Sequence, residues 1–458
     1  MSMMKMTGVR VPHHKHSAGL APVRLPVPQK VVLPMSMHIG APAKPVVKRG
    51  DHVDVGQLIA EPGGFVSAPI HASVSGTVKR LGFLLNSGGQ KVPTVEIESD
   101  GLQTPYEGLQ APTVTDQESF LKAVRDSGVV GLGGAGFPTS VKLSVKDLSK
   151  IEAVIINGAE CEPYITSDTR TMLDRSEEVC QGIAMLETYL QAKRIIIGIE
   201  ENKPDCISLY RKLFADSKTV EVKSLPSVYP QGGEKVLIYN TTGRIVPEGK
   251  LPIDAGAIVI NCTTLAVIAQ YVRTGMPLVE KCVTVDGSAI EKPQNVIAPI
   301  GTPIRVLVDF VQPECKAAKV LYGGPMMGIS VPNMEHPILK STNAVTLFAE
   351  KDAVLPQQTA CIHCGRCIAH CPMHLMPTAM DRAYRMGDYE KLEALKVNLC
   401  MECGCCSFIC PAKRYLVQTN KLAKAGLRAY QAEKKAQAER DEARRKAREA
   451  KEQEAKTE

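Results

Sequence analysis

Eight cysteines in the C-terminal third of the chain stand at spacings that suit metal clusters. Two runs share the pattern Cys-x2-Cys-x2-Cys-x3-Cys-Pro. Their members are Cys361, Cys364, Cys367 and Cys371, and then Cys400, Cys403, Cys406 and Cys410. Three closely spaced thiolates can hold one face of an iron–sulfur cubane, and a more distant thiolate can complete it. The doubled pattern therefore predicts two [4Fe–4S] clusters and a role in carrying electrons.

The spacing also predicts which cysteines share a cluster. In bacterial two-cluster runs of this type, the fourth cysteine of each run ligates the cluster of the other run. We therefore assign one cluster to Cys361, Cys364, Cys367 and Cys410, and the second to Cys400, Cys403, Cys406 and Cys371. Structural zinc is the alternative, but zinc sites usually pair two Cys-x-x-Cys units. Cys405 lies outside the pattern and is interpreted as a spare thiol.

The segment between the two runs is long for a compact ferredoxin. Residues 376–397 have helical spacing with a break at Gly387. This segment resembles the helical-ferredoxin variant, so we expect residues 352–425 to form a helical two-cluster ferredoxin domain. Residues 426–458 follow as a charged tail. From residue 431 on it carries nine Lys/Arg and eight Asp/Glu, often four apart as in Glu442 and Lys446, which favours a solvated helix.

Composition limits the class of protein. The 458 residues carry a net charge of +7 and include 15 cysteines, no Trp and eight Phe. Such a length predicts roughly three or four domains. The weak basic balance and few aromatic residues argue against nucleic-acid binding. Clustered cysteines predict a reducing compartment, the cytoplasm. No apolar run of about 18 residues is present, so no membrane-spanning helix is expected.

Polar loops follow buried strands in the middle of the chain. Gly131, Gly133 and Gly136 match the pattern G-x-G-x-x-G, although a tight turn is the better explanation when the motif is taken alone. Glu160 and Glu162 follow an expected strand at 153–157. A Gly-rich stretch at 231–235 ends in Lys235, which could meet a phosphate, and another polar stretch spans 261–265. Alternating strands and helices place such loops at the ligand-binding edge of an α/β sheet.

These four stretches, in this order, resemble the flavin-bearing, NADH-oxidising subunit of respiratory complex I. The matching segments read GGAGFPT at 133–139, NGAECEP at 157–163, GEK at 233–235 and NCTTL at 261–265. The resemblance implies FMN contacts from Asn157, Glu160, Asn261 and Thr264, and a place for Glu162 beside the nicotinamide. It implies that the loop containing Gly131, Gly133, Gly134 and Gly136 approaches the nucleotides.

The match has three departures from that family. Ala159 replaces an Asp, Lys235 replaces the second Glu of a G-E-E motif, and Thr263 replaces a Glu. A rival function is therefore a non-catalytic iron–sulfur relay or scaffold subunit with degenerate flavin and nucleotide sites. A soluble flavin dehydrogenase that acts alone is a third reading. The sequence gives no sign of a fused substrate-reducing domain, which argues against this third hypothesis.

The remaining segments predict smaller modules around an α/β domain at 115–278. Residues 1–38 are expected to form an extended arm. Its histidines could bind a metal, but no acidic or Cys partner lies near them, which favours a plain flexible basic arm. Residues 39–100 alternate short strands and turns and resemble the lipoyl-carrier barrel-sandwich fold, without the carrier lysine near residues 69–73. Residues 279–348 turn β-rich, with expected strands that include 305–308, and suggest a β-grasp domain.

The complete order of modules resembles the C-subunit family of Rnf-type membrane electron-transport complexes. The predicted fold class is thus multidomain α/β: a barrel-sandwich module, a Rossmann-like flavin/NADH domain, a β-grasp domain and a helical two-cluster ferredoxin domain. The resemblance implies a peripheral subunit on the cytoplasmic face of the cell membrane. It also implies electron transfer between NAD(H), FMN and clusters, coupled to ferredoxin, and attachment to the membrane only through membrane-embedded and iron–sulfur partner subunits.

Overall fold

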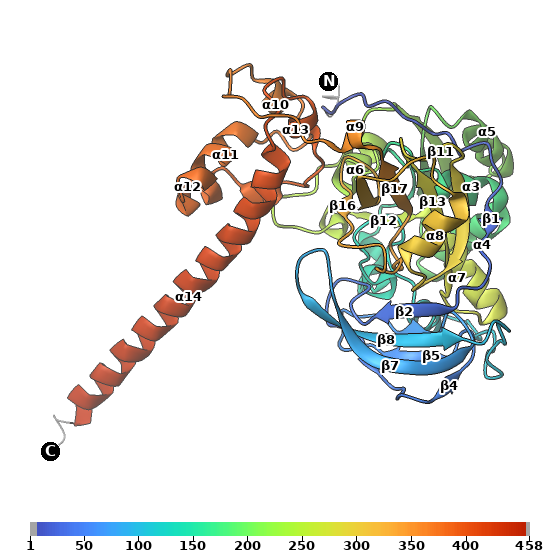
Figure 1. Cartoon of the computed structure of the whole chain (residues 1–458). Helices are drawn as coiled ribbons and strands as arrows, with labels where there is room; N and C mark the ends of the chain where they lie inside the picture. Colours follow the sequence, from blue (N-terminus) through green and yellow to red (C-terminus); the bar gives the residue numbers. More distant parts are fainter. Residues whose placement is uncertain (1–6, 455–458) are drawn as a thin grey trace. The chain divides into compact units, whose positions relative to one another are not determined.

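The computed structural model describes residues 7–454, which divide into two compact units (Figure 1). The first unit contains residues 10–355, and the second contains residues 7–9 and 356–454. Within residues 7–454, no helix combines the length and the apolar character needed to cross a membrane.

The first unit contains the expected barrel-sandwich module. One antiparallel sheet has the order β2 (Lys30–Pro34), β8 (Lys91–Ser99), β7 (Gly76–Leu85) and β4 (His52–Val53). The second sheet consists of β3 (Lys44–Pro45), β5 (Leu58–Glu61) and β6 (Ile70–His71). Alternating apolar residues of both sheets are buried between them, among them Val31, Leu33, Val53, Ile59, Ile70, Val78, Val95 and Ile97.

The expected N-terminal arm is wrong for the described residues. Residues 30–34 form β2 of the barrel-sandwich sheet and pair with β8. Before it, β1 (Val23–Arg24) pairs in parallel with a strand of another sheet, β14 (Gln294–Pro299). Val11 and Leu25 are buried. The sequence did not reveal this packing because the strands that pair with β1 and β2 lie far along the chain.

A four-stranded parallel sheet forms the centre of the first unit. Its order is β11 (Val220–Leu225), β10 (Ile195–Glu200), β9 (Ala153–Gly158) and β12 (Ala257–Asn261). Every residue of β10 is buried, as expected for a parallel strand covered on both faces. The helices include α3 (Ser167–Asp174), α4 (Ser176–Tyr189), α5 (Pro204–Leu213), α6 (Glu234–Thr242) and α7 (Cys262–Thr274). The strand order reverses between β9 and β12, which is where open α/β sheets bind ligands.

A six-stranded mixed sheet follows in the chain. Its order is β1, β14, β13 (Glu280–Asp286), β17 (Ala344–Phe348), β15 (Lys319–Tyr322) and β16 (Ile329–Ser330). The strand expected at 305–308 is wrong, because these residues lie in α8 (Ile304–Val311). Its buried residues are Ile304, Leu307, Val308 and Val311. Their spacing of three and four residues is helical, whereas the β-branched composition alone favoured a strand.

The second unit is helical, as predicted. It contains α10 (Arg366–Ala369), α11 (Pro377–Arg385), α12 (Tyr389–Ala394), α13 (Cys405–Phe408) and α14 (Leu416–Glu454). The N-terminal part of α14 packs on α11. The hydrophobic core of the second unit includes Met380, Leu392, Ala423 and Leu427. Beyond residue 430 the helix is mostly exposed, and the expected pair of Glu442 and Lys446 is confirmed at 2.8 Å.

Candidate functional site

The second unit brings five cysteines around one small cavity. Cys371 of the first run lines it together with Cys400, Cys403 and Cys406 of the second run. This is the set of thiols that the crossed assignment gives to one cluster. Cys405 also lines the cavity, and its thiol is buried. Four thiols of this kind fit the ligand set of a [4Fe–4S] cluster, leaving Cys405 as the extra one.

Two members of the other assigned set, Cys367 and Cys410, are neighbours. Burial raises the pKa of the Cys367 thiol, and the neighbouring Cys410 thiol raises it further. The pKa of the Arg414 guanidinium is raised first by its hydrogen bond to Asp381, and then by the thiols of Cys361 and Cys410. Cys410 therefore faces members of the first run, in the direction that the crossed assignment requires.

Polar groups of the second unit point at the sulfur atoms. The backbone N–H of Leu375 donates to the Cys371 sulfur at 3.4 Å, and the Asn420 amide donates to the Cys400 sulfur at 3.6 Å. Lys424 donates to the carbonyl of Cys400 at 2.9 Å and so holds the start of the second run. Hydrogen bonds to ligand sulfur atoms stabilise their anionic form and tune the potential of a bound cluster.

The central sheet places two asparagines side by side at its ligand-binding edge. Asn157 lies near the end of β9 and Asn261 ends β12, and the two residues are register partners at the reversal of strand order. The Asn157 amide donates to the Gly232 carbonyl at 3.0 Å, which ties the stretch before α6 to this edge. Asn261 caps α7, because its side chain accepts a hydrogen bond from the Thr264 N–H. Three of the four predicted stretches therefore meet here.

The Gly-rich loop packs against the same edge. The N–H of Leu132 donates to the Thr264 hydroxyl at 3.1 Å. A Cβ at Gly133 would lie 2.5 Å from the Asn261 amide nitrogen, so only glycine fits this approach. Gly136 has a φ of 68°, in the left-handed region that favours glycine. A Cβ at Gly134 would meet no protein atom within 4 Å, so the loop tip faces open space.

Glu160, an expected flavin contact, has a carboxylate that accepts hydrogen bonds from the protein itself. One carboxylate oxygen accepts from the N–H of Asp168 at 2.6 Å, and the other accepts from the Thr169 N–H and hydroxyl. These donors belong to the first turn of α3, where a carboxylate stabilises the unpaired N–H groups. The geometry makes Glu160 a positioning residue for its loop. Its backbone φ of 48° is in the left-handed region, which fits a loop held by many contacts.

Asp168 connects this loop to the start of α7. Its carboxylate accepts from the Asn261 amide at 2.7 Å and from the Thr263 hydroxyl at 2.6 Å. Thr263 is one of the three departures from the complex I pattern, and here its hydroxyl is a donor to a buried acid. Lys235, another departure, is half-buried on the first turn of α6.

Glu162 is held by a turn of the six-stranded sheet. Its carboxylate oxygens accept from the N–H of Met326 at 3.1 Å and of Met327 at 2.7 Å, in the turn between β15 and β16. A Cβ at Gly324 would lie 2.4 Å from the carboxylate, so glycine is needed for this approach. Burial raises the pKa of Glu162 to about 7, although these hydrogen bonds oppose the rise. The proposed catalytic carboxyl is thus a group that changes charge near neutral pH.

Replacing Glu162 by Gln should change how stability depends on pH. The carboxyl keeps its proton up to about pH 7 in the folded chain but only to about 4.5 when unfolded. The wild-type protein therefore loses stability as the pH rises from about 4.5 through 7, and Glu162→Gln does not share this loss. Measured by Tm, the variant should gain on the wild type between about pH 5 and pH 8. The exposed Glu291→Gln serves as the charge-loss control. A Tm difference that is equal at both pH values contradicts the pKa assignment.

Three lysines with buried ammonium groups were missed by sequence reasoning. Lys203 donates to the Ala159 carbonyl at 2.6 Å, Lys281 donates to the Leu132 carbonyl at 2.8 Å, and Lys15 donates into the 160–165 loop. Each ammonium binds the backbone of a loop that the sequence did predict. No signal in the sequence distinguishes them, because lysines are ordinarily exposed.

The N-terminal histidines, which could have formed a metal site, have separate polar partners, although the His14 and His16 rings lie 5.6 Å apart. His13 faces Asn202, His14 stacks on Tyr164, and His16 pairs with Asp286. His38 bonds the Ser67 hydroxyl in the barrel-sandwich module. Within the described part of the chain these four side chains do not share a metal-binding group.

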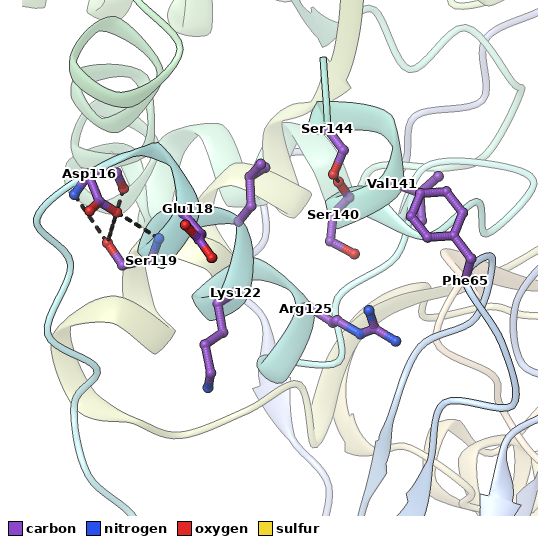
Figure 2. Close-up of a pocket in the computed structure, with 10 residues that line it drawn as sticks. Phe65, Asp116, Glu118, Ser119, Lys122, Arg125, Ser140, Val141 and Ser144 are labelled. Atoms are coloured by element: carbon purple, nitrogen blue, oxygen red, sulfur yellow. Dashed lines mark hydrogen bonds between the residues drawn. The ribbon is translucent and has the colours of Figure 1, made fainter. Parts of the chain in front are cut away.

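A separate cavity of about 490 Å³ is lined by other residues (Figure 2). Its walls come from α1 (Gln117–Asp126), from the stretch 140–144 and from the exposed Phe65. None of the predicted site residues lines it. The cavity is therefore not part of the candidate flavin or cluster sites.

Comparison with known proteins assigns three segments of the chain to domain families. Residues 4–102 match the RnfC barrel sandwich hybrid domain, residues 124–270 match the Nuo51 FMN-binding domain, and residues 353–446 match a 4Fe-4S dicluster domain. A chain that joins a flavin domain to a dicluster domain is an oxidoreductase component of the electron-transport class. This chain belongs to the C-subunit family of Rnf-type ion-translocating oxidoreductase complexes.

The relatives support this membership over most of the chain. The C subunit of the Na+-translocating ferredoxin:NAD+ oxidoreductase complex of Acetobacterium woodii is 41% identical, over 91% of this chain and 95% of its own. The C subunit of the proton-translocating ferredoxin:NAD+ oxidoreductase complex of Clostridium ljungdahlii is 40% identical, over 82% of this chain and 83% of its own. A polypeptide of an NAD+-reducing [NiFe]-hydrogenase shares the fold, with a TM-score of 0.50 and 19% identity over 68% of this chain and 63% of its own.

Proposed function

We propose that this protein transfers electrons between NAD(H), FMN and two [4Fe–4S] clusters as part of a ferredoxin:NAD+ oxidoreductase complex. The observation that carries the proposal is the meeting of the Gly-rich loop, Asn157 and Asn261 at the reversal of strand order. When bound, FMN supplies the conversion between the two-electron transfer of a hydride and the transfer of single electrons. The clusters would carry the single electrons. NAD(H) is the proposed substrate because the open tip at Gly134 leaves room for a second nucleotide.

The residues of the chain then have distinct proposed roles. The Gly-rich loop, with Gly131, Gly133, Gly134 and Gly136, lets backbone N–H groups approach phosphates. Asn157, Asn261 and Thr264 form the edge against which the flavin would lie, and Lys235 offers a cation there. Glu162 would stand near the nicotinamide, where its raised pKa suits a group that gains or loses a proton near neutral pH. Glu160 acts through the loop that it positions.

The domain assignments are proposed on the same basis. The parallel sheet and its crossover helices support a Rossmann-like domain at 115–278. The mixed sheet with α8 packed on β13 supports a β-grasp-like domain at 279–348. The barrel-sandwich module, now including β2, precedes them, and the cluster domain at 352–425 and the charged tail at 426–458 follow.

Cofactor content tests the proposal against its rival. Protein reconstituted anaerobically should contain about eight iron atoms per chain, as two cubanes require, and should bind FMN in a one-to-one ratio. The rival relay function has an observation in its favour, since the Glu160 carboxylate is occupied by α3 and the Glu162 carboxylate by the 324–328 turn. Iron–sulfur absorption without any bound flavin would support the relay and contradict the proposal.

We further propose that the protein is peripheral on the cytoplasmic side and reaches the membrane through partner subunits. From residue 431 on, the chain carries nearly balanced charge, nine basic against eight acidic residues. A polybasic anchor needs several unopposed cations, each worth about 1 kcal/mol near an anionic surface. The barrel-sandwich module is the proposed docking element, and its β7 exposes Leu81, Phe83 and Leu85.

Centrifugation tests this localisation. Expressed alone, the protein should stay in the supernatant, and expressed with its membrane partners it should pellet. Deleting residues 431–458 should leave the pelleted fraction nearly unchanged, because the tail lacks both excess charge and an apolar face. Binding of the isolated chain to anionic liposomes that depends on residues 431–458 would contradict the proposal.

A further inference from the structure

An N-terminal segment lies along the acidic loop of the candidate flavin site. The carbonyl of His13 accepts from the N–H of Tyr164 at 2.9 Å, and the His14 ring stacks on the Tyr164 ring with centroids 4.8 Å apart. Ser17 and Thr166 share a hydrogen bond of 2.6 Å between their hydroxyls. Residues 13–17 are therefore one wall of the loop at 159–166, although 149 residues separate Ser17 from Thr166 in the sequence.

Lys15 is the member of this wall whose charge enters the loop. Its ammonium donates to the carbonyls of Glu160 at 2.8 Å, Glu162 at 2.8 Å and Ile165 at 2.6 Å. The residue as a whole is partly exposed, whereas the ammonium lies among these carbonyls, and burial lowers the pKa of Lys15 to about 8. All three N–H bonds of the cation are thus directed at backbone oxygens of one loop.

The loop has a shape that needs such a cation. Glu160 and Tyr164 have φ values of 48° and 70°, in a region that side-chain-bearing residues rarely adopt. The turn that results aims three carbonyl oxygens at one point, where they repel each other unless a donor lies between them. Lys203 binds a fourth carbonyl, that of Ala159. Without the Lys15 ammonium, repulsion between the three carbonyl oxygens favours another conformation of the loop.

We propose that Lys15 is a positioning residue that fixes the 160–165 loop in the shape that receives the flavin. The inference rests on the proposed function, because it assumes that this loop borders bound FMN. It places part of the site in the N-terminal segment, which neither the sequence motifs nor the matched FMN-binding domain at 124–270 includes.

The test compares Lys15→Met with the wild type in the full-length chain. Met has nearly the length of Lys but no donor and no charge, so the three carbonyls lose their partner. We expect the Kd for added FMN, measured by quenching of flavin fluorescence, to rise at least about tenfold. The midpoint potential of the flavin that does bind should also shift, because the loop backbone around it has moved. Lys30→Met, at an exposed lysine of the same N-terminal region, should leave both quantities unchanged.

Two further measurements keep the outcome unambiguous. The iron–sulfur absorption should be the same in Lys15→Met and Lys30→Met as in the wild type, since the eight cluster cysteines belong to the other compact unit. If Lys15→Met does not fold, Lys15→Gln, which keeps a shorter neutral donor, is judged by the same criteria. A variant with wild-type Kd and potential overturns the role of Lys15. A wild-type protein that binds no FMN overturns the proposed function itself, which is a distinguishable result.

Discussion

Changing Cys410 to Ala should remove iron from the cluster that Cys361, Cys364 and Cys367 hold, although Cys410 belongs to the other run. The physical reason is the crossed ligation of two-cluster runs, supported by the place of Cys371 among the second-run thiols and of Cys410 beside Cys367. Iron analysis should fall from about eight atoms per chain toward about four. The EPR spectrum of the reduced protein should retain one cluster.

Double variants decide which cysteines share a cluster. With crossed ligation, Cys361→Ala combined with Cys410→Ala should lose no more iron than either change alone, because both ligands belong to one cluster. With ligation inside each run, the same double variant would lose both clusters. Cys405→Ala is the matched control, since this thiol lines the same cavity as the second-run cysteines but is outside the spacing, and it should keep about eight iron atoms.

Replacing Gly134 by Phe should slow the reduction of flavin by NADH at least about 100-fold, since a small misplacement at a reacting centre has effects of this size. A Cβ at this position meets no protein atom within 4 Å, so the fold can accept a side chain. The space that it fills is the one in which we place the nucleotide. Gly133→Phe is less informative because it would collide with Asn261 and disturb the protein itself.

Stopped-flow absorbance of bound flavin measures this effect. Gly19→Phe is the control, since Gly19 is exposed, is likewise surrounded by open space and lies outside the Gly-rich loop. FMN should still bind to Gly134→Phe, which separates the nucleotide site from the flavin site. Reduction of its flavin at the wild-type rate would show that NADH does not use this loop.

Features governed by spacing could be predicted from the sequence. The cysteine spacing predicts the grouping of Cys371 with the second run, and the buried strands before Asn157 and Asn261 predict the ligand-binding edge. The sequence of the helix at 304–311 favours a strand because it is rich in β-branched residues. The helical spacing of its buried residues is the weaker signal in so short a segment. The packing of the N-terminal segment is hidden because its partners lie far along the chain.

The positioning residues could not be predicted, for a different physical reason. The roles of Lys15, Lys203 and Lys281 come from loops that fold around their ammonium groups, not from any neighbour in sequence. The carboxylate of Glu160 illustrates the same limit. Its motif suggested a ligand contact, whereas the first turn of α3 supplies its donors. A motif identifies the loop, but tertiary packing decides which of its side chains face the ligand.

An anaerobic titration with NADH tests whether NADH, FMN and the clusters exchange electrons in this protein. The sample is the full chain loaded with FMN and both clusters, monitored by flavin absorbance and by EPR of the clusters. The first NADH per chain carries two electrons and should bleach the flavin, and further NADH should produce the signals of reduced clusters. Flavin and clusters that dithionite reduces but NADH leaves oxidised would contradict it.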